Sequence, residues 1–368
     1  MDALLIYGAY GYTGRLIARE AVAQGGSPVV AGRDGRAVAR QADALGVEGR
    51  VIDLESDDPA SHLERFDAVV NCAGPFVDTA EPLVTACLET GTDYLDITGE
   101  FPVFESLRQR DDAARETEVT LLPGVGFDVV PSDCLAAFLA DQLPAADTLR
   151  LGIKSDGGLS RGTARTLVEH LGSGGVVRRN GRLIQVPAAF RTRAIDFGDG
   201  PEHAVTIPWG DVVTAAHSTG IESVEVYAAA PSWATRGLAA ADSLGWLLER
   251  GPVKRLLKRV IDTRLDGPDG AQLAADSAVV WGEVTDAETS RRTRARLRTP
   301  NPYALTAEAA VVAAERMLED QNSVPDGFQT PASAFGSEFV LELAGTKREL
   351  VETPDESNES TRVLVKPT

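Results

Sequence analysis

Short apolar runs alternate with amphipathic stretches along the first part of the chain. The runs predict buried strands over Leu4–Tyr7, Ser27–Arg33, Val47–Asp53, Phe66–Gly74, Thr92–Thr98 and Val119–Pro123. The stretches between them predict helices that start after Gly14 and that cover 36–45, 80–90 and 103–116. Strands that alternate with helices are typical of a parallel sheet with crossover helices, where ligands bind at the carboxyl ends of the strands.

This alternation stops after Pro131. The pattern then predicts helices over 132–142 and 162–171, and strands over 148–156, 176–186, 203–207, 223–229, 278–285 and 291–299. The polar turn 286–290 joins the last two strands into a predicted hairpin. A long helix over 304–320, which we expect to return to the first domain, and a short element over 335–345 complete a mixed, largely antiparallel second part.

Glycine recurs at every third position directly after the first strand. Strand, glycine turn and helix together indicate dinucleotide binding, because glycine lets the backbone approach a pyrophosphate and the helix N-terminus offers free N–H groups to that anion. The alternative is a turn that needs glycine only for steric reasons. The cofactor-binding residues that we predict in this turn are Gly8, Tyr10, Gly11, Tyr12, Thr13 and Gly14.

The end of the second strand distinguishes between two dinucleotides, since it carries Arg33 followed by Asp34. Arginine at this point pairs with a ribose 2′-phosphate, so we expect NADP(H). Alternatively Arg33 is solvated and Asp34 takes the acidic role of NAD-binding proteins. Asp53 either contacts the adenine amine or caps a helix. The residues expected to line the ribose and nicotinamide path, or to form only a rigid turn, are Asn71, Ala73, Gly74 and Pro75.

We therefore expect an α/β protein, with a Rossmann-type doubly wound parallel sheet and a second α+β domain of mixed or antiparallel sheet. A length of 368 residues suits two domains. The expected division is an NADP-binding Rossmann domain over 1–130, an α+β substrate and dimerisation domain over 131–303, a C-terminal helix and segment returning to the Rossmann domain over 304–350, and a flexible acidic tail over 351–368.

The formal net charge of −19 argues against one class of partner. Phosphate contacts need clustered lysine and arginine, so we expect no nucleic acid binding. Abundant acid with scarce lysine suggests the salt-rich cytoplasm of an extreme halophile, because salt screens carboxylate repulsion.

We expect a cytoplasmic protein without a membrane span or signal peptide. The scattered histidines and three cysteines have no metal-ligand spacing, so we expect no metal site.

Four motifs together resemble the saccharopine dehydrogenase-like oxidoreductases: Gly8–Gly14, Asn71–Phe76, Tyr94–Glu100 and Gly124–Asp133. The closer likeness is to the trans-acting enoyl reductase branch of that family, as Ser160–Glu169, Asn301–Ala307 and Thr330–Gly336 also indicate. The resemblance covers most of the chain and implies hydride transfer from NADP(H). It does not identify the substrate, because the family spans amino-acid C–N chemistry, lipid C=C reduction and members without a settled activity.

Proton donors are expected after the fourth to sixth strands and near the returning helix. We predict catalytic roles for Glu100, Asp128 and Tyr303. A carboxyl group in a closed cleft can have its pKa raised enough to act as a general acid. Glu100 is alternatively a structural carboxylate held by backbone N–H groups, and Asp128 a member of a capping turn.

A basic amphipathic stretch over 246–261 interrupts this acidic chain. It predicts contact with anionic lipid or an acyl carrier, or else a surface helix packed on the second domain. The helix start at Gly162 and Thr163 either presents N–H groups to an anionic substrate or is purely structural. The expected partners are a small-molecule, acyl or lipid substrate and a second copy in a homodimer.

We expect hydride transfer to a C=C bond of a lipid-like or acyl substrate. One alternative is a saccharopine-type C–N oxidoreductase that acts on an amino acid, although the sequence has no evident arginine cluster for a dicarboxylic substrate. The other alternative is a non-catalytic dinucleotide-binding sensor or scaffold.

Overall fold

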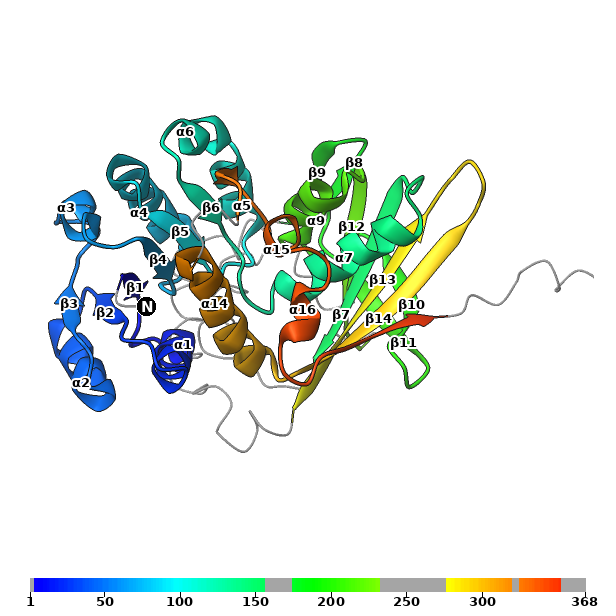
Figure 1. The fold of residues 1–368 in the computed structure, drawn as a ribbon. Helices are drawn as coiled ribbons and strands as arrows, with labels where there is room; N and C mark the ends of the chain where they lie inside the picture. Colours follow the sequence, from blue (N-terminus) through cyan, green and yellow to red (C-terminus); the bar gives the residue numbers. More distant parts are fainter. Residues whose placement is uncertain (1–2, 156–173, 232–275, 320–323, 352–368) are drawn as a thin grey trace, which may run out of the picture.

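The computed structural model describes residues 3–155, 174–231, 276–319 and 324–351. Within these ranges the chain builds two β-sheets, with helices on and between them (Figure 1). The first, sheet A, contains the N-terminal strands, and the second, sheet B, contains the strands of the middle of the chain.

Sheet A is parallel throughout, with the strand order β15-β6-β5-β4-β1-β2-β3. Its strands are β1 (Leu4–Tyr7), β2 (Val29–Gly32), β3 (Gly49–Val51), β4 (Ala68–Asn71), β5 (Asp93–Asp96), β6 (Thr120–Leu122) and β15 (Gly327–Phe328). The order reverses between β1 and β4, which pair from Leu4 with Ala68 to Tyr7 with Asn71. The connections leave these two strands in opposite directions, so a crevice opens at their carboxyl ends.

The helices that accompany sheet A are α1 (Tyr12–Ala23), α2 (Gly35–Leu45), α3 (Pro59–Leu63), α4 (Phe76–Thr90), α5 (Phe101–Arg108) and α6 (Asp111–Glu116). All residues of β1 and β4 are buried, as is typical of strands that helices cover on both faces. The long helix α14 (Pro302–Glu319) returns from the far end of the chain and packs against α1 (Figure 1).

Sheet B is mixed, with the order β10-β11-β12-β7-β13-β14-β16 and with β8 paired to β12 and β9. Its strands are β7 (Thr148–Ser155), β8 (Gly175–Arg179), β9 (Arg182–Val186), β10 (Thr192–Asp196), β11 (Pro201–Thr206), β12 (Ser223–Ala229), β13 (Ser277–Thr285), β14 (Arg292–Pro300) and β16 (Lys347–Val351). The strands β12 and β7 pair in parallel, and the other described pairs are antiparallel.

Two helices cover the face of sheet B that is turned toward sheet A: α7 (Val130–Gln142) and α9 (Asp211–Thr219) (Figure 1). Helix α7 approaches β13 so closely that a Cβ atom at Gly282 would lie 2.5 Å from the Cδ1 atom of Leu139. The short helices α15 (Pro331–Phe335) and α16 (Phe339–Glu342) pack beside α7. One continuous hydrophobic core therefore runs from sheet A into sheet B.

The fold class predicted from the hydrophobic pattern is confirmed, while some element limits are wrong. Residues 176–186 form a hairpin and not one strand, because the backbone turns at Asn180 and Gly181 with φ of 47° and 75°. The helix predicted over 103–116 is two helices. The second begins at Asp111, whose carboxylate accepts the N–H of Phe328 at 2.7 Å and so ties α6 to β15.

Some of the predictions are left open by the structure. The helix predicted over 162–171, with Gly162 and Thr163, lies outside the described residues, as do the stretch 246–261 and the tail from residue 352 onward. The division of the chain at residues 130, 303 and 350 stays a prediction. The pattern did not predict β10 or α9, and α9 is the element that brings the second part of the chain against the site described next.

Leu135 of α7 is fully buried and faces Gly282 of β13. The change Leu135→Ala leaves a cavity where α7 meets sheet B, so the free energy of unfolding should fall by about 2–5 kcal/mol. Urea denaturation followed by tryptophan fluorescence measures this loss. The control is Leu350→Ala, because Leu350 is 54% exposed. The control should change the free energy by less than about 0.5 kcal/mol, and equal losses in both variants would contradict the packing described here.

Candidate dinucleotide and proton-transfer site

The turn between β1 and α1 lies directly against the turn between β4 and α4. A Cβ atom at Gly8 would lie 2.7 Å from the backbone nitrogen of Ala73, and one at Gly14 would lie 2.4 Å from the carbonyl oxygen of Gly8. Gly8 also has a φ of 77°, a conformation that favours glycine. Backbone packing therefore requires glycine at both positions.

The same turn fits a dinucleotide. Helix α1 starts after Gly11 at its N-cap, and no side chain among the described residues caps it. The first N–H groups of a helix without a side-chain cap can bind a pyrophosphate. The steric requirement for glycine and the binding role thus occur together in residues 8–14.

The predicted adenosine-binding residues gather around the end of β1. The Tyr10 hydroxyl accepts the backbone N–H of Asp34 at 3.3 Å. Burial raises the pKa of Tyr7 to about 12, with Tyr10 and Asp53 adding to the shift and Arg33 opposing it. These side chains therefore surround one buried phenol, although they come from the ends of three different strands.

Arg33 and Asp34 have different roles in the structure. The Asp34 carboxylate caps α2 by accepting the N–H groups of Arg36 at 2.9 Å and Ala37 at 3.1 Å. Arg33 is exposed and forms no ion pair with another described residue. Asp53 accepts a backbone N–H two residues further on at 3.2 Å, which is a turn-stabilising role. Of these groups, Arg33 is the one that the protein itself leaves for an anionic ligand.

A buried chain of hydrogen bonds joins the ends of β4 and β5. The Asn71 side chain accepts the N–H of Ala73 at 3.0 Å and donates to the Tyr94 hydroxyl at 3.2 Å. That hydroxyl donates to Asp96 at 2.9 Å, and the other Asp96 oxygen accepts two backbone N–H groups at 3.0 and 2.9 Å. Burial nevertheless raises the pKa of Asp96 to about 6. This network shapes the loops after β4, β5 and β6, and Gly74 and Pro75 lie exposed beside it.

Glu100 is buried and stabilises the start of α4. Its two carboxylate oxygens accept the N–H groups of Phe76 at 3.2 Å and Val77 at 3.1 Å. Pro75, at the N-cap of α4, supplies no side-chain cap, so Glu100 performs this task from 24 residues away. Because both oxygens are engaged by helix N–H groups, this arrangement matches the structural role that the sequence left open for Glu100.

The Asp128 carboxyl group has no hydrogen bond from another described residue. It lies against Gly99, where a Cβ atom would be 2.8 Å from its Oδ2 atom. Burial raises the pKa of Asp128 to about 7, and the charge of Glu100 adds to the shift. The Trp209 indole donates to the Asp128 backbone carbonyl at 2.7 Å and holds the loop in place. Asp128 can therefore be protonated near neutral pH.

Tyr303 lies at the other side of the glycine turn. Its ring packs edge-on against Tyr12, with centroids 5.1 Å apart and an interplanar angle of 82°. Its backbone N–H donates to the Asn301 side chain at 2.9 Å, which sets the start of α14. The adjoining Thr306 hydroxyl accepts the N–H of Phe127 at 2.9 Å. The structure thus brings Tyr303 next to the predicted cofactor turn and joins α14 to the loop that carries Asp128.

Two features of the site were missed by sequence reasoning. Asp211, at the start of α9, is fully buried, and neither of its carboxyl oxygens has a hydrogen-bond partner among the described residues. Burial raises its pKa well above the usual range, and Asp133 and Asp128 add to this. An acid directly before the apolar pair Val212 and Val213 was the available signal. Burial without hydrogen-bond donors disfavours the charged form of a carboxyl group, so the environment of Asp211 favours its neutral form.

The second missed feature is an apolar pocket of about 450 Å³ next to the site. Its lining consists of Phe101, Pro102, Gly174, Val176, Leu183, Gln185 and Pro208. Phe101 directly follows Glu100, and Pro208 directly precedes the tryptophan that holds the Asp128 loop. The β8–β9 hairpin, which the sequence pattern predicted as a single strand, provides the opposite wall.

Neither a metal centre nor a membrane span is found where the structure can be described. In those ranges no three His, Cys, Asp or Glu side chains gather in a way that could hold a metal ion. None of the helices described has the length and apolar character needed to cross a bilayer.

Residues 4–122 match the family model described as the saccharopine dehydrogenase NADP binding domain. A Mycobacterium tuberculosis protein named as a trans-acting enoyl reductase is 33% identical over 184 residues, which are 46% of this chain and 44% of that protein. A saccharopine dehydrogenase-like oxidoreductase of Bos taurus is 32% identical over 151 residues, 35% of either chain. The matched segments span less than half the length of these relatives.

Among solved structures, the apo L-Glu-forming saccharopine dehydrogenase of Saccharomyces cerevisiae has the same overall fold. The TM-score is 0.65, and the match covers 96% of this chain and 100% of that chain. The sequence identity is 13%, so this likeness concerns the fold.

The role of Glu100 can be tested through stability. Glu100→Ala removes both acceptors from the first N–H groups of α4, so the free energy of unfolding should fall by about 1–3 kcal/mol. Glu100→Gln keeps one acceptor oxygen and should recover part of that loss. Urea denaturation of the two variants at neutral pH makes the comparison. Unchanged stability of Glu100→Ala would show that these hydrogen bonds do not hold α4.

Proposed function

We propose that this protein, whose residues 4–122 match the saccharopine dehydrogenase NADP binding domain, is an NADP(H)-dependent oxidoreductase that reduces a C=C bond of a lipid-like or acyl substrate. The observation that carries the proposal is a partly buried carboxyl group, that of Asp128, which can be protonated at neutral pH beside a dinucleotide-binding turn and an apolar pocket. Hydride transfer to an alkene needs these three parts together: a nicotinamide, a proton donor and a dry pocket.

The residues that would hold the dinucleotide come from three strand ends. The turn at Gly8–Gly14 would bind the pyrophosphate through the N–H groups of α1, and Arg33 would pair with the 2′-phosphate of NADP(H). The backbone after Asn71 would border the nicotinamide ribose, as would Tyr12 with its partner Tyr303. When bound, the reduced nicotinamide supplies a hydride to one alkene carbon.

Asp128 supplies the balancing proton. Its O–H bond breaks as a new C–H bond forms at the second alkene carbon, and the carboxylate that remains takes up a proton from solvent for the next cycle. The two oxygens of Glu100 accept helix N–H groups, and the charge of Glu100 adds to the rise in the pKa of Asp128 that burial causes.

The apolar pocket supports a lipid-like or acyl substrate. Phe101, Val176, Leu183 and Pro208 offer carbon surface to a hydrocarbon chain, and burying each methylene there contributes about 0.8 kcal/mol. Among the described residues, the pocket lining includes no lysine or arginine that would pair with a dicarboxylic amino acid. We therefore favour C=C reduction over the C–N chemistry of a saccharopine-type substrate.

The NADP(H) preference is tested by calorimetric titration with NADPH and separately with NADH. The unmodified protein should bind NADPH at least about tenfold more tightly, which corresponds to about 1.4 kcal/mol. Arg33→Ala should weaken NADPH binding and leave NADH binding almost unchanged, because only NADPH carries the 2′-phosphate. Arg36→Ala, on the same exposed edge, is the control. Equal weakening of both cofactors by Arg33→Ala would exclude its proposed role.

The proton donor is tested by NADPH oxidation with unsaturated acyl thioesters as substrates. Asp128 must be protonated to donate, so the rate should be constant below pH 7 and fall as the pH rises through about 7. Asp128→Asn should lower kcat by about 10²–10⁴ and remove this alkaline decrease, with NADPH affinity unchanged. Asp112→Asn, at an exposed position on α6, serves as the control.

Turnover with amino-acid imines but with no unsaturated acyl compound would overturn the proposed substrate class. NADPH binding without any turnover would favour a sensor or scaffold.

A further inference from the structure

Sheet B has a second face, which lies opposite α7 and α9 and which the proposed reaction does not use. Along β7, Leu149 and Leu151 belong to the core beneath these helices, so the intervening Arg150 points to the other side. Along β14 the same alternation sends Ala295 and Leu297 inward. The side chains that share the outer side of β14 are Arg292, Arg294, Arg296 and Arg298.

Two buried glutamates organise the arginines on this outer face. Glu225 of β12 is 5% exposed and accepts Arg179 at 3.0 Å and Arg191 at 2.9 Å, with Arg150 at 3.8 Å and the Tyr227 hydroxyl at 2.6 Å. Its oxygens are therefore surrounded by donors from three other strands or loops.

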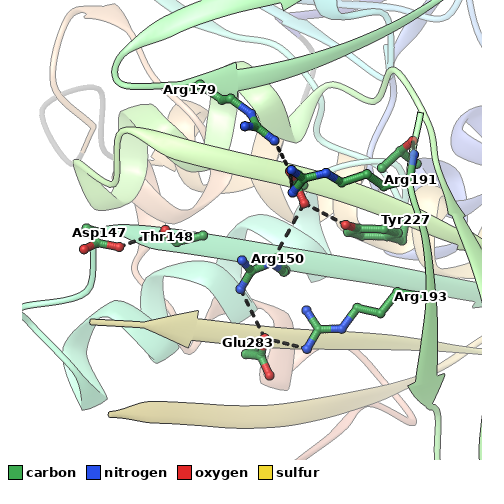
Figure 2. A network of polar contacts seen from close by, with 10 residues as sticks. Asp147, Thr148, Arg150, Arg179, Arg191, Arg193, Tyr227 and Glu283 are labelled. Atoms are coloured by element: carbon green, nitrogen blue, oxygen red, sulfur yellow. Dashed lines mark hydrogen bonds and ion pairs between the residues drawn. The ribbon is translucent and has the colours of Figure 1, made fainter. Parts of the chain in front are cut away.

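Glu283 of β13 is 2% exposed and is held in the same way. It accepts Arg294 at 2.6 Å, Arg193 at 2.7 Å and Arg150 at 3.3 Å. Figure 2 shows Arg150 directed toward Glu283, with the side chains of Arg179, Arg191 and Arg193 on the same face of the sheet. Arg150 also lies 3.8 Å from Glu225. We call the set of Arg150, Arg179, Arg191, Arg193 and Arg294 the arginine platform.

The charges of the platform do not cancel. Among the described residues, five arginines share two carboxylates, which gives this set an excess of three positive charges on a chain whose net charge is −19. The guanidinium groups are partly accessible, with side-chain exposures of 23% to 45%. Because the glutamates already hold them in place, little conformational entropy is lost when an anion binds their remaining N–H groups.

We propose that the arginine platform is a docking surface for an acidic segment of a partner protein. The row continues along β14 into Arg298 and into Arg296, which is 14% exposed and pairs with Asp196 at 2.8 Å and Glu349 at 3.4 Å. Alternate residues of this strand are about 7 Å apart. Such a row complements a series of carboxylates along a helix or strand better than a single small anion. The partly recessed guanidinium groups also favour side chains that reach between the strands over a flat bilayer surface.

This surface is separate from the proposed reaction site. The platform lies on the outer face of sheet B, whereas Asp128 and the apolar pocket lie on the side of α9. A partner bound at the platform therefore leaves the cleft accessible. The platform would serve to recruit a partner that delivers or accepts the substrate, and it does not depend on which bond is reduced.

The test uses the full chain and fluorescently labelled poly-L-glutamate, with binding measured by fluorescence anisotropy. Arg179→Gln combined with Arg191→Gln removes two platform charges, while Glu225 keeps Arg150 and Tyr227 as partners. The matched control is Arg65→Gln with Arg115→Gln, which removes two similarly exposed arginines that pair with carboxylates near sheet A. We expect about tenfold weaker binding for the platform variant, a control within twofold of the unmodified protein, and binding that weakens with added salt.

Three results would overturn the proposal. The first is an equal loss in the platform and control variants, which would indicate only a general charge effect. The second is binding of phosphatidylserine vesicles with no binding of poly-L-glutamate. The third is poly-L-glutamate binding that appears only when the acidic residues at 352, 355, 356 and 359 are changed to amides, which would assign the platform to this chain's own tail. NADPH affinity, measured in parallel, should be equal in all variants, so failure of this proposal is distinguishable from failure of the proposed reaction.

Discussion

The contact between the β1–α1 and β4–α4 turns determines the geometry of the nucleotide-binding half. With a Cβ atom at Gly8 the two turns would overlap at Ala73, and with one at Gly14 the first turn of α1 would collide with the Gly8 carbonyl. Absence of both side chains lets β1 and β4 end at the same level, where the strand order reverses. The crevice, the open N-terminus of α1 and the position of Asn71 all depend on that approach.

The acidic residues around this crevice differ in what their oxygens bind. Glu100 accepts two helix N–H groups and Asp96 accepts two backbone N–H groups and a tyrosine hydroxyl, so both are held by the protein. Asp128 lies beside them with no hydrogen bond from the described residues and with the charge of Glu100 nearby. Unequal environments of this kind separate the protonation states of chemically similar groups, which acid catalysis requires.

Sheet B combines two different surfaces in one layer. Its inner face contributes Leu149, Leu151 and Val280 to the hydrophobic core, and its outer face carries Glu225 and Glu283 beneath several arginines. A buried carboxylate is costly unless donors surround it, and here each one has at least three. The resulting arrangement leaves positive charge on one side of the sheet and an apolar pocket on the other.

Much of the fold could be predicted from the sequence because its causes are local. Hydrophobic periodicity located strands β1 to β6 of sheet A but not β15, and it located the β13–β14 hairpin and the long helix α14. Glycine spacing located the turn after β1. The alternation of arginine with apolar residues along β14 was also present in the sequence, although only the paired sheet shows which side each residue takes. The family resemblance, drawn from short motifs, agrees with the match of residues 4–122.

Tertiary structure decided the roles of individual polar groups. Glu100 and Asp128 are both acids in turns after neighbouring strands. The approach of α4 gives Glu100 two donors, whereas no described residue donates to the Asp128 carboxyl group. Glu225 and Glu283 meet arginines from several strands, so no spacing in the chain could reveal the platform. The physical reason is the distance along the sequence over which each effect operates. Backbone conformation and hydrophobic periodicity are set by residues close together in the sequence, whereas desolvation, charge pairing and pKa depend on groups that folding brings together from distant parts of the chain.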